Sequence, residues 1–158
     1  MVICLKWSDV VSFLLALLFV VSAVPTAVRS IGRDDAVKEV SSVLEGQSAS
    51  EKLLVYLFLD AIREQSNLFY KPYYTVNPTV AYYFTAVKEI KETGANTYIT
   101  FSMSPYIGPH DTIGEDEVTF RVDHSGRITA EEFRHLKSYS LPDQLSHIEK
   151  GELPPLSE

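Results

Sequence analysis

The sequence has almost no cysteine: Cys4 is the single one among 158 residues. It lies near the N-terminus, in a segment that we expect to be removed from the working protein or embedded in a membrane. The remaining chain can therefore form no disulfide, bind no metal through thiolates and perform no thiol redox chemistry. An exported domain of this kind is stabilised by packing, which is more usual in bacterial envelopes than among small secreted eukaryotic domains.

Clusters of basic residues are also missing. The chain has 14 Lys and Arg against 21 Asp and Glu, and its formal net charge is −7. A surface that follows nucleic-acid phosphates needs grouped Lys and Arg, so we expect no nucleic-acid partner. The sequence also has no Gly-x-Ser-x-Gly elbow, no phosphate-binding glycine loop and no metalloprotease motif. We therefore expect no cofactor and assign no catalytic residue and no metal site.

What the sequence does have is a long apolar run at residues 10–24, interrupted by two serines. Its length suits the apolar part of a signal peptide and falls short of the roughly 20 residues that span a bilayer. Small residues that a signal peptidase recognises follow at Val21-Ser22-Ala23. We expect residues 1–23 to be a signal peptide, with an uncleaved anchor and a buried helix of a cytosolic fold as alternatives. The domain is then secreted, or anchored at the outer face of a bacterial membrane. It contacts the membrane only if the N-terminal segment is not cleaved.

The next part of the chain is helical in pattern. Residues 24–47 are expected to be a spacer that contains a short helix. Ser48 and Glu51 then have the spacing of a capping box, which begins a helix. Apolar residues recur on one face of this helix up to Tyr70, and Pro72 ends it. We expect it to be the main helix of a domain at residues 48–139.

The following segments alternate as strands do. Strands are predicted at residues 79–90 and 97–103, joined as a hairpin, the first with Val80, Tyr82, Phe84 and Ala86 on one face. A loop at 105–116 precedes a strand containing Val118, Phe120 and Val122, and a turn at His124-Ser125-Gly126 leads into a last segment at 127–133. The predicted fold class is α+β, one long amphipathic helix on three or four antiparallel strands, cystatin-like or NTF2-like by analogy. Residues 140–158 are expected to be a flexible tail.

Two stretches are candidates for function. Residues 123–133 match the later part of an EF-hand loop, but Arg121 occupies the first ligand position and would repel calcium, so an ordinary turn explains them better. The loop at 106–117 places His110 among carboxylates. It is open to three interpretations: a connection shaped by its glycines, a metal site shared with Asp111 or Asp116 and with His124 or His135, or a ligand- or proton-handling site. The tyrosines between Phe69 and Phe84 can bind a partner or line the junction of helix and sheet.

From Glu51 to about Tyr139 the chain resembles a bacterial family catalogued as domain of unknown function 3888, found as short signal-bearing proteins of Gram-positive spore-formers. The residues that carry the resemblance are Gly108-Pro109-His110, Gly114, Asp116, Thr119-Phe120-Arg121-Val122 and Phe133-Arg134-His135. The resemblance implies an extracytoplasmic domain and supplies no reaction. It couples His110 with His135 as two positions that can share a site. The candidate ligand-binding or structural residues are therefore Gly108, His110, Gly114, Asp116 and His135.

Three functions remain open on this basis. The first is noncatalytic binding of a peptide, protein or small ligand of the bacterial envelope. The second is a metal- or proton-dependent enzyme that uses His110, Asp116 and His135. The third is a membrane-tethered structural or regulatory protein.

Overall fold

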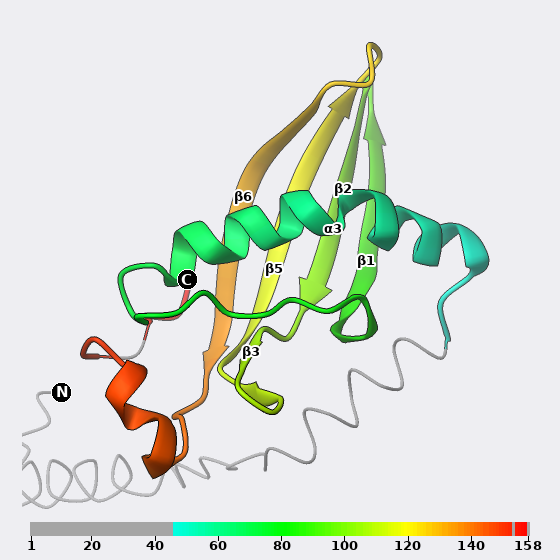
Figure 1. Ribbon diagram of the computed structural model, residues 1–158. Helices are drawn as coiled ribbons and strands as arrows, with labels where there is room; N and C mark the ends of the chain where they lie inside the picture. The colour runs from blue at the N-terminus through cyan, green and yellow to red at the C-terminus, as the bar shows by residue number, and fades with distance from the viewer. Residues whose placement is uncertain (1–45, 153, 158) are drawn as a thin grey trace, which may run out of the picture. The chain divides into compact units, whose positions relative to one another are not determined.

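The computed structural model of the chain describes residues 46–152 and 154–157 (Figure 1). The expected signal segment at 1–23 and nearly all of the expected spacer at 24–47 lie outside the described residues. Within the described part, no helix is both long enough and apolar enough to cross a bilayer.

Helix α3 (Ala49–Tyr70) begins and ends where the sequence predicts. The Ser48 hydroxyl accepts the Glu51 backbone N–H at 3.3 Å, and the Glu51 carboxylate accepts the Ser48 N–H at 2.7 Å, so the capping box is formed. The Lys71 N–H closes the last turn on the Asn67 carbonyl. Every third or fourth residue of the helix is buried, namely Val55, Phe58, Ile62, Ser66 and Tyr70.

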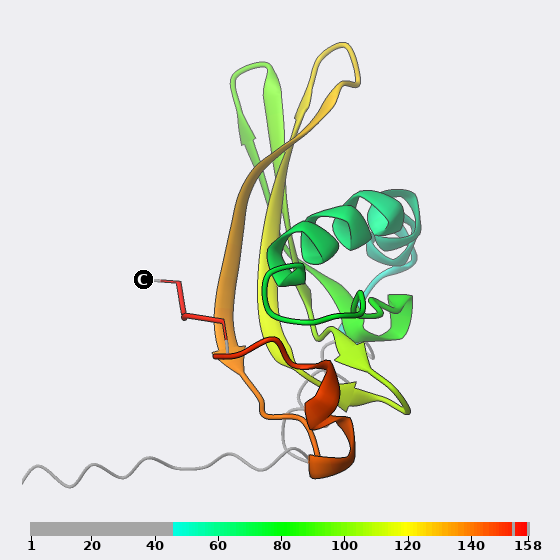
Figure 2. The same ribbon diagram turned by 60° about the vertical axis from the view of Figure 1, so that its left-hand side comes forward.

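A four-stranded antiparallel sheet packs against this helix, which confirms the α+β prediction. Its strands lie in the order β1 (Thr85–Thr93), β2 (Asn96–Met103), β5 (Gly114–Asp123) and β6 (Ile128–Ser138). The predicted hairpin of the first two strands is formed, and β5 and β6 form a second hairpin. Figure 2 shows α3 on one face of the sheet, while the opposite face carries no helix of the described chain.

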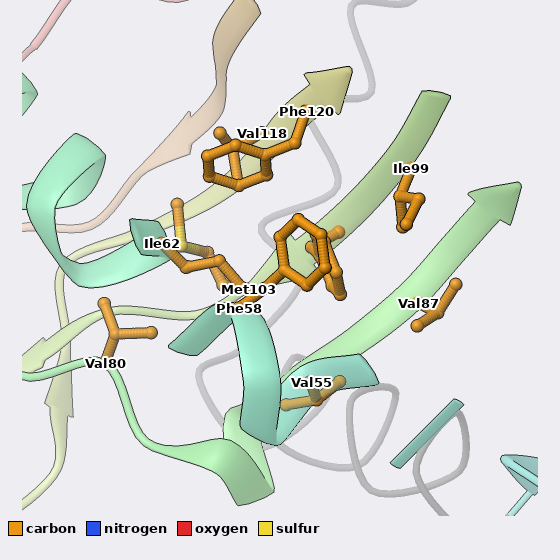
Figure 3. Packing of buried hydrophobic residues seen from close by; sticks show 10 residues of the cluster. Val55, Phe58, Ile62, Val80, Val87, Ile99, Met103, Val118 and Phe120 are labelled. Atoms are coloured by element: carbon orange, nitrogen blue, oxygen red, sulfur yellow. The ribbon is translucent and has the colours of Figure 1, made fainter. Parts of the chain in front are cut away.

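The main core lies between α3 and the covered face of the sheet (Figure 3). The Phe58 ring lies at its centre, 5.2 Å from the ring of Phe101 and 5.5 Å from that of Phe120. Ile99, Phe101 and Met103 are buried in alternation along β2, as the sequence predicts. The remaining buried members of this core are Val55, Ile62, Val80, Val87 and Val118.

The strand predicted at 79–90 is wrong in its first half. Residues Tyr82–Phe84 form a short 3₁₀ helix, η1, and β1 begins only at Thr85. The Thr85 hydroxyl donates to the Ala81 carbonyl across this turn. Tyr82 consequently has 51% of its surface exposed, although the alternating pattern placed it on the apolar face of a strand.

The segment expected to be a loop at 105–116 has structure of its own. Two short strands, β3 (Tyr106–Ile107) and β4 (Asp111–Thr112), pair antiparallel as a small separate sheet. Strand β5 already begins at Gly114, two residues before the predicted end of the loop. The last strand likewise runs on to Ser138, beyond the predicted limit of 133.

The tail predicted to be flexible from Leu141 is in fact packed on the domain. A second 3₁₀ helix, η2 (Asp143–Ile148), follows β6, and Leu141 and Ile148 are buried. They form a second apolar cluster with Tyr70, Tyr74, Ile107 and Ile113. The Thr75 N–H donates to the Ile148 carbonyl and the Lys150 N–H donates to the Tyr73 carbonyl. These bonds fasten the segment to the loop that follows α3.

Candidate functional site

A buried polar network joins the end of α3 to strands β5 and β6 of the sheet. Asp116 lies on β5 opposite His135 on β6, and Asp116 Oδ1 is 2.5 Å from His135 Nδ1. Tyr70, the last residue of α3, donates its hydroxyl to Asp116 at 2.9 Å from Oδ2. Asp116 alternates with Val118 on β5, so its side chain points to the face that α3 covers.

All three side chains of this network are removed from water. Tyr70 and His135 have 0% of their surface exposed and Asp116 has 1%. Burial raises the pKa of the Asp116 carboxyl, while the hydrogen bonds from His135 and Tyr70 act in the opposite direction. Burial, and secondarily the adjacent Asp116, raises the pKa of Tyr70. The Tyr70 hydroxyl therefore stays protonated as a donor to Asp116.

The other ring nitrogen of His135 contacts a serine. His135 Nε2 lies 2.7 Å from Ser138 Oγ, and Ser138 Oγ donates to the Pro154 carbonyl at 2.9 Å. Ser157 pairs with the main chain of His135 in both directions, since its N–H donates to the His135 carbonyl at 2.7 Å and its hydroxyl accepts the His135 N–H at 2.8 Å. Residues 154–157 thus lie along the edge strand of the sheet.

A glycine is needed at position 114 because side chains of this network lie close to the backbone there. A side-chain carbon added at Gly114 would lie 2.7 Å from His135 Cε1 and 2.9 Å from the Lys137 carbonyl oxygen, and closer still to the Tyr70 hydroxyl. Real Cβ atoms show no such contacts, so only glycine fits here without displacement of its neighbours. Of the predicted residues, Gly114, Asp116 and His135 therefore belong to one site.

His110 does not join them. It is exposed in the β3–β4 turn, where its Nε2 lies 3.0 Å from the Tyr83 hydroxyl and its ring lies tilted against that of Tyr106, with the ring centroids 4.7 Å apart. Its φ of 75° is the one positive value of a non-glycine residue among those described. Gly108 precedes it at φ 61° and faces the Leu145 side chain. Gly108 and His110 shape a turn, and the site predicted to combine His110 with Asp116 and His135 is not formed.

The stretch that imitates an EF-hand is an ordinary turn. Asp123 Oδ1 accepts the Ser125 N–H at 2.9 Å and the Arg127 N–H at 3.1 Å, and it accepts the Ser125 hydroxyl as well. These bonds, the Ser125 hydroxyl foremost, lower the pKa of Asp123 to about 2. Gly126 has φ 80°, which completes the turn. In the described part of the chain, no group of three or more His, Cys, Asp or Glu is arranged to hold a metal ion.

The face of the sheet opposite α3 carries a polar groove of about 510 Å³. At its floor lies Glu117, whose side chain is 6% exposed and forms ion pairs with Lys88 and with Arg134. Thr100 and Thr119 exchange a hydroxyl hydrogen bond at 2.9 Å beside it. The rest of the lining consists of Glu89, Lys91, Thr93, Tyr98 and Glu132.

Sequence reasoning missed several members of these two sites. The sequence analysis placed Tyr70 only at the end of the helix, and it did not single out Ser138. Neither residue is near Asp116 in the sequence, so no local pattern connects them to it. Lys88, Glu117 and Arg134 were also missed, although their places in alternating strands carried a signal. A charged residue that alternates with buried apolar ones belongs to the opposite face of the sheet.

The fold and these sites define a small α+β domain. The family described as Protein of unknown function (DUF3888) matches residues 50–137, more than half of the chain, and the chain belongs to it. The match covers α3, the whole of β1, β2 and β5, and β6 up to its last residue but one. No curated protein and no solved structure matches the chain.

Proposed function

We propose that this protein is an extracytoplasmic domain that binds an extended peptide segment along the polar groove on the open face of its sheet. The observation that supports this most directly is the groove itself, with Glu117 at its floor between Lys88 and Arg134. A nearly buried carboxylate held by two cations is a fixed feature of the surface, because its geometry is constrained from both sides.

The charges of the groove favour a ligand that carries both signs. Lys91 lies on β1, and Glu89 and Glu132 lie on the two outer strands. None of these three forms an ion pair within the described residues, unlike Lys88, Glu117 and Arg134. Charged groups of both signs are thus available along the groove. A peptide with alternating Lys and Glu complements them, whereas a ligand that carries a single sign of charge is repelled by Lys91 or by the two glutamates.

The groove also offers hydrogen-bonding groups between the charges. Thr93, Tyr98, Thr100 and Thr119 carry hydroxyls on neighbouring strands. Such hydroxyls can pair with backbone amides of an extended chain, and Tyr98 adds apolar contact area. This mixture is typical of peptide-binding surfaces, which combine a few aromatic contacts with polar ones.

Titration of the folded chain with a panel of eight-residue peptides of alternating charge tests this proposal. We expect amide NMR shifts at Tyr98, Thr100 and Thr119, and a dissociation constant at least tenfold weaker for Lys91→Glu, because the substitution reverses one groove charge. Lys52→Glu, the same change on an exposed residue of α3, is the matched control and should leave binding unchanged. Equal effects of the two variants, or shifts confined to the α3 face, would overturn the proposal.

The export of the domain is a second, separable part of the proposal. It is supported by the apolar run at 10–24 and by Val21-Ser22-Ala23 behind it. N-terminal sequencing of the protein recovered outside the cytoplasm should find a chain that starts at Val24. A chain that starts at Met1 would instead support the membrane-tethered alternative.

The metal- or proton-dependent enzyme built from His110, Asp116 and His135 is not proposed in that form. His110 contacts Tyr83 and Tyr106, while Asp116 and His135 contact Tyr70 and Ser138. Groups that act together on a substrate must meet in space, and these three do not.

A further inference from the structure

The buried network leads to Ser138, and its side chains are arranged like those that activate a serine nucleophile. Asp116 Oδ1 is 2.5 Å from His135 Nδ1, and His135 Nε2 is 2.7 Å from Ser138 Oγ. A carboxylate that orients an imidazole, which in turn contacts a hydroxyl, is the arrangement that converts serine into a nucleophile. The contact between His135 and Ser138 lies in the range of about 2.6–3.2 Å that proton transfer requires, and the contact between Asp116 and His135 is slightly shorter.

Tyr70 and Gly114 hold this arrangement in place. The Tyr70 hydroxyl donates to the Asp116 carboxyl and so orients it toward His135. Gly114 allows the His135 ring to lie directly against the β5 backbone. Catalytic groups need such support, because their hydrogen bonds must be set before a substrate arrives.

Residues 154–157 determine which way the hydrogen bond between Ser138 and His135 runs. The Pro154 carbonyl can only accept, so the Ser138 hydroxyl proton points to it at 2.9 Å. Ser138 then has only lone pairs to offer His135, and Nε2 must carry a proton and donate it. An imidazole protonated at Nε2 cannot take a proton from serine. The network is therefore held inactive while Pro154 is in place.

Removal of Pro154 reverses this hydrogen bond. The Ser138 hydroxyl loses its acceptor, and His135 Nε2 lies 2.7 Å from it as an alternative one. As the segment separates, the Nε2 proton passes to the solvent water that replaces Pro154; His135 then donates from Nδ1 to Asp116 and accepts from Ser138, which is the orientation of a general base. The same side chains thus have two arrangements: an inactive one with residues 154–157 in place, and an active one after these residues have separated.

Few interactions hold residues 154–157 on the sheet. Among the described residues, they are the two bonds between Ser157 and the main chain of His135, the bond from Ser138 to Pro154, and the burial of the Pro154 ring. Pro155 is exposed, and 59% of the surface of Leu156 is exposed. The segment can therefore separate from the edge strand without disruption of either apolar cluster.

We propose that Ser138 is an acyl-accepting nucleophile, activated by His135 and Asp116, which residues 154–157 cover until they are displaced. The substrate class is an activated ester or another carbonyl electrophile. In the first step Ser138 Oγ forms a bond to the carbonyl carbon, the bond to the leaving alcohol breaks, and the serine proton passes through His135 Nε2 to the leaving oxygen. Water releases the acyl group by the reverse sequence of proton transfers.

The experiment compares the full chain with Ser157→Pro, which removes both hydrogen bonds to His135. Each is treated with a fluorophosphonate, in which Ser138 Oγ displaces fluoride at phosphorus and the proton leaves with it through His135. Peptide mass spectrometry identifies the labelled serine. We expect Ser138 to be labelled at least tenfold faster in Ser157→Pro than in the unaltered chain, and p-nitrophenyl acetate to be hydrolysed faster by the same variant.

The controls separate this activity from ordinary serine exposure. Ser125 is an exposed turn serine whose hydroxyl donates to Asp123 and contacts no histidine among the described residues, so its labelling should stay slow in both proteins. Ser157→Pro with Ser138→Ala should lose the added hydrolysis, whereas Ser157→Pro with Ser125→Ala should keep it. Ser157→Ala keeps the N–H bond and should give an intermediate rate, which decides the matter if the proline variant unfolds. Labelling of Ser138 no faster than that of Ser125 in the folded variant would overturn the proposal.

Discussion

Asp116 Oδ1 and His135 Nδ1 lie 2.5 Å apart, and neither side chain has any surface exposed to water. The pair connects β5 to β6 in the half of the sheet where the helix ends, and Tyr70 extends it to α3. Whatever the chemistry of Ser138, this pair is also a structural element, because loss of one partner leaves a buried polar group unsatisfied.

Asp116→Asn should therefore destabilise the fold strongly. Removing one partner of a buried pair leaves the other without compensation, and we expect a loss of about 3 kcal/mol in the free energy of unfolding. Glu131→Gln is the matched change in an exposed pair, since Glu131 contacts Arg121 at the surface, and it should cost less than about 1 kcal/mol. Urea denaturation of both variants measures the difference. Equal losses of unfolding free energy would show that the buried pair stabilises the fold no more than the exposed pair does.

Gly114→Ala should be destabilising for a different reason, which is lack of space. The added carbon would lie 2.7 Å from His135 Cε1 and 2.9 Å from a backbone oxygen. Overpacking of this kind typically costs about 1–3 kcal/mol, and the upper end is expected because one neighbour is main chain. Gly46→Ala is the control, because a carbon added there meets no atom within 4 Å. Thermal melts of the two variants should differ by several degrees, and a Gly114→Ala melt equal to that of Gly46→Ala would contradict the expected clash.

Local sequence signals predicted the helix, the first hairpin and the turn between β5 and β6 well, because the groups that define them are close in the chain. Ser48 and Glu51 are three residues apart, and the buried residues of β2 alternate within a single strand. The same logic misplaced Tyr82, since the order Val80, Tyr82, Phe84 alternates like a strand even though residues 82–84 turn as a 3₁₀ helix.

The candidate site was predicted only in part, because it depends on contacts between distant segments. The sequence analysis grouped His110 with Asp116 and His135; the pairing of β5 with β6 brings Asp116 to His135, but His110 lies elsewhere, beside Tyr83. Tyr70 reaches Asp116 across 46 residues of chain, and no spacing rule contains that contact. Ser138 is close to His135 in sequence, yet the direction of its hydrogen bond depends on the Pro154 carbonyl, which lies 16 residues further along the chain.

Asp123 gives the β5–β6 hairpin a dependence on pH. Its folded pKa of about 2 is below the ordinary value of 3.8, so the folded state favours the ionised form. The stabilisation is fully present above pH 4 and is lost as the pH falls through about 2. The melting temperatures of the unaltered chain and of Asp123→Asn should thus differ at pH 5 and converge near pH 2. Melts recorded by circular dichroism at half-unit steps measure this, and a difference that grows toward low pH would contradict the assignment.

Ile148 tests the packing of the C-terminal segment, which composition alone suggested to be flexible. Its side chain is 9% exposed and lies in the cluster with Tyr70 and Tyr74. Ile148→Ala should therefore cost about 2–3 kcal/mol of unfolding free energy, because it removes buried methylene groups and leaves a cavity. Leu156→Ala removes a side chain of similar size at a position that is 59% exposed, and it should change stability by less than about 0.5 kcal/mol. Similar stabilities of the two variants would mean that the packing of Ile148 in this cluster does not stabilise the fold.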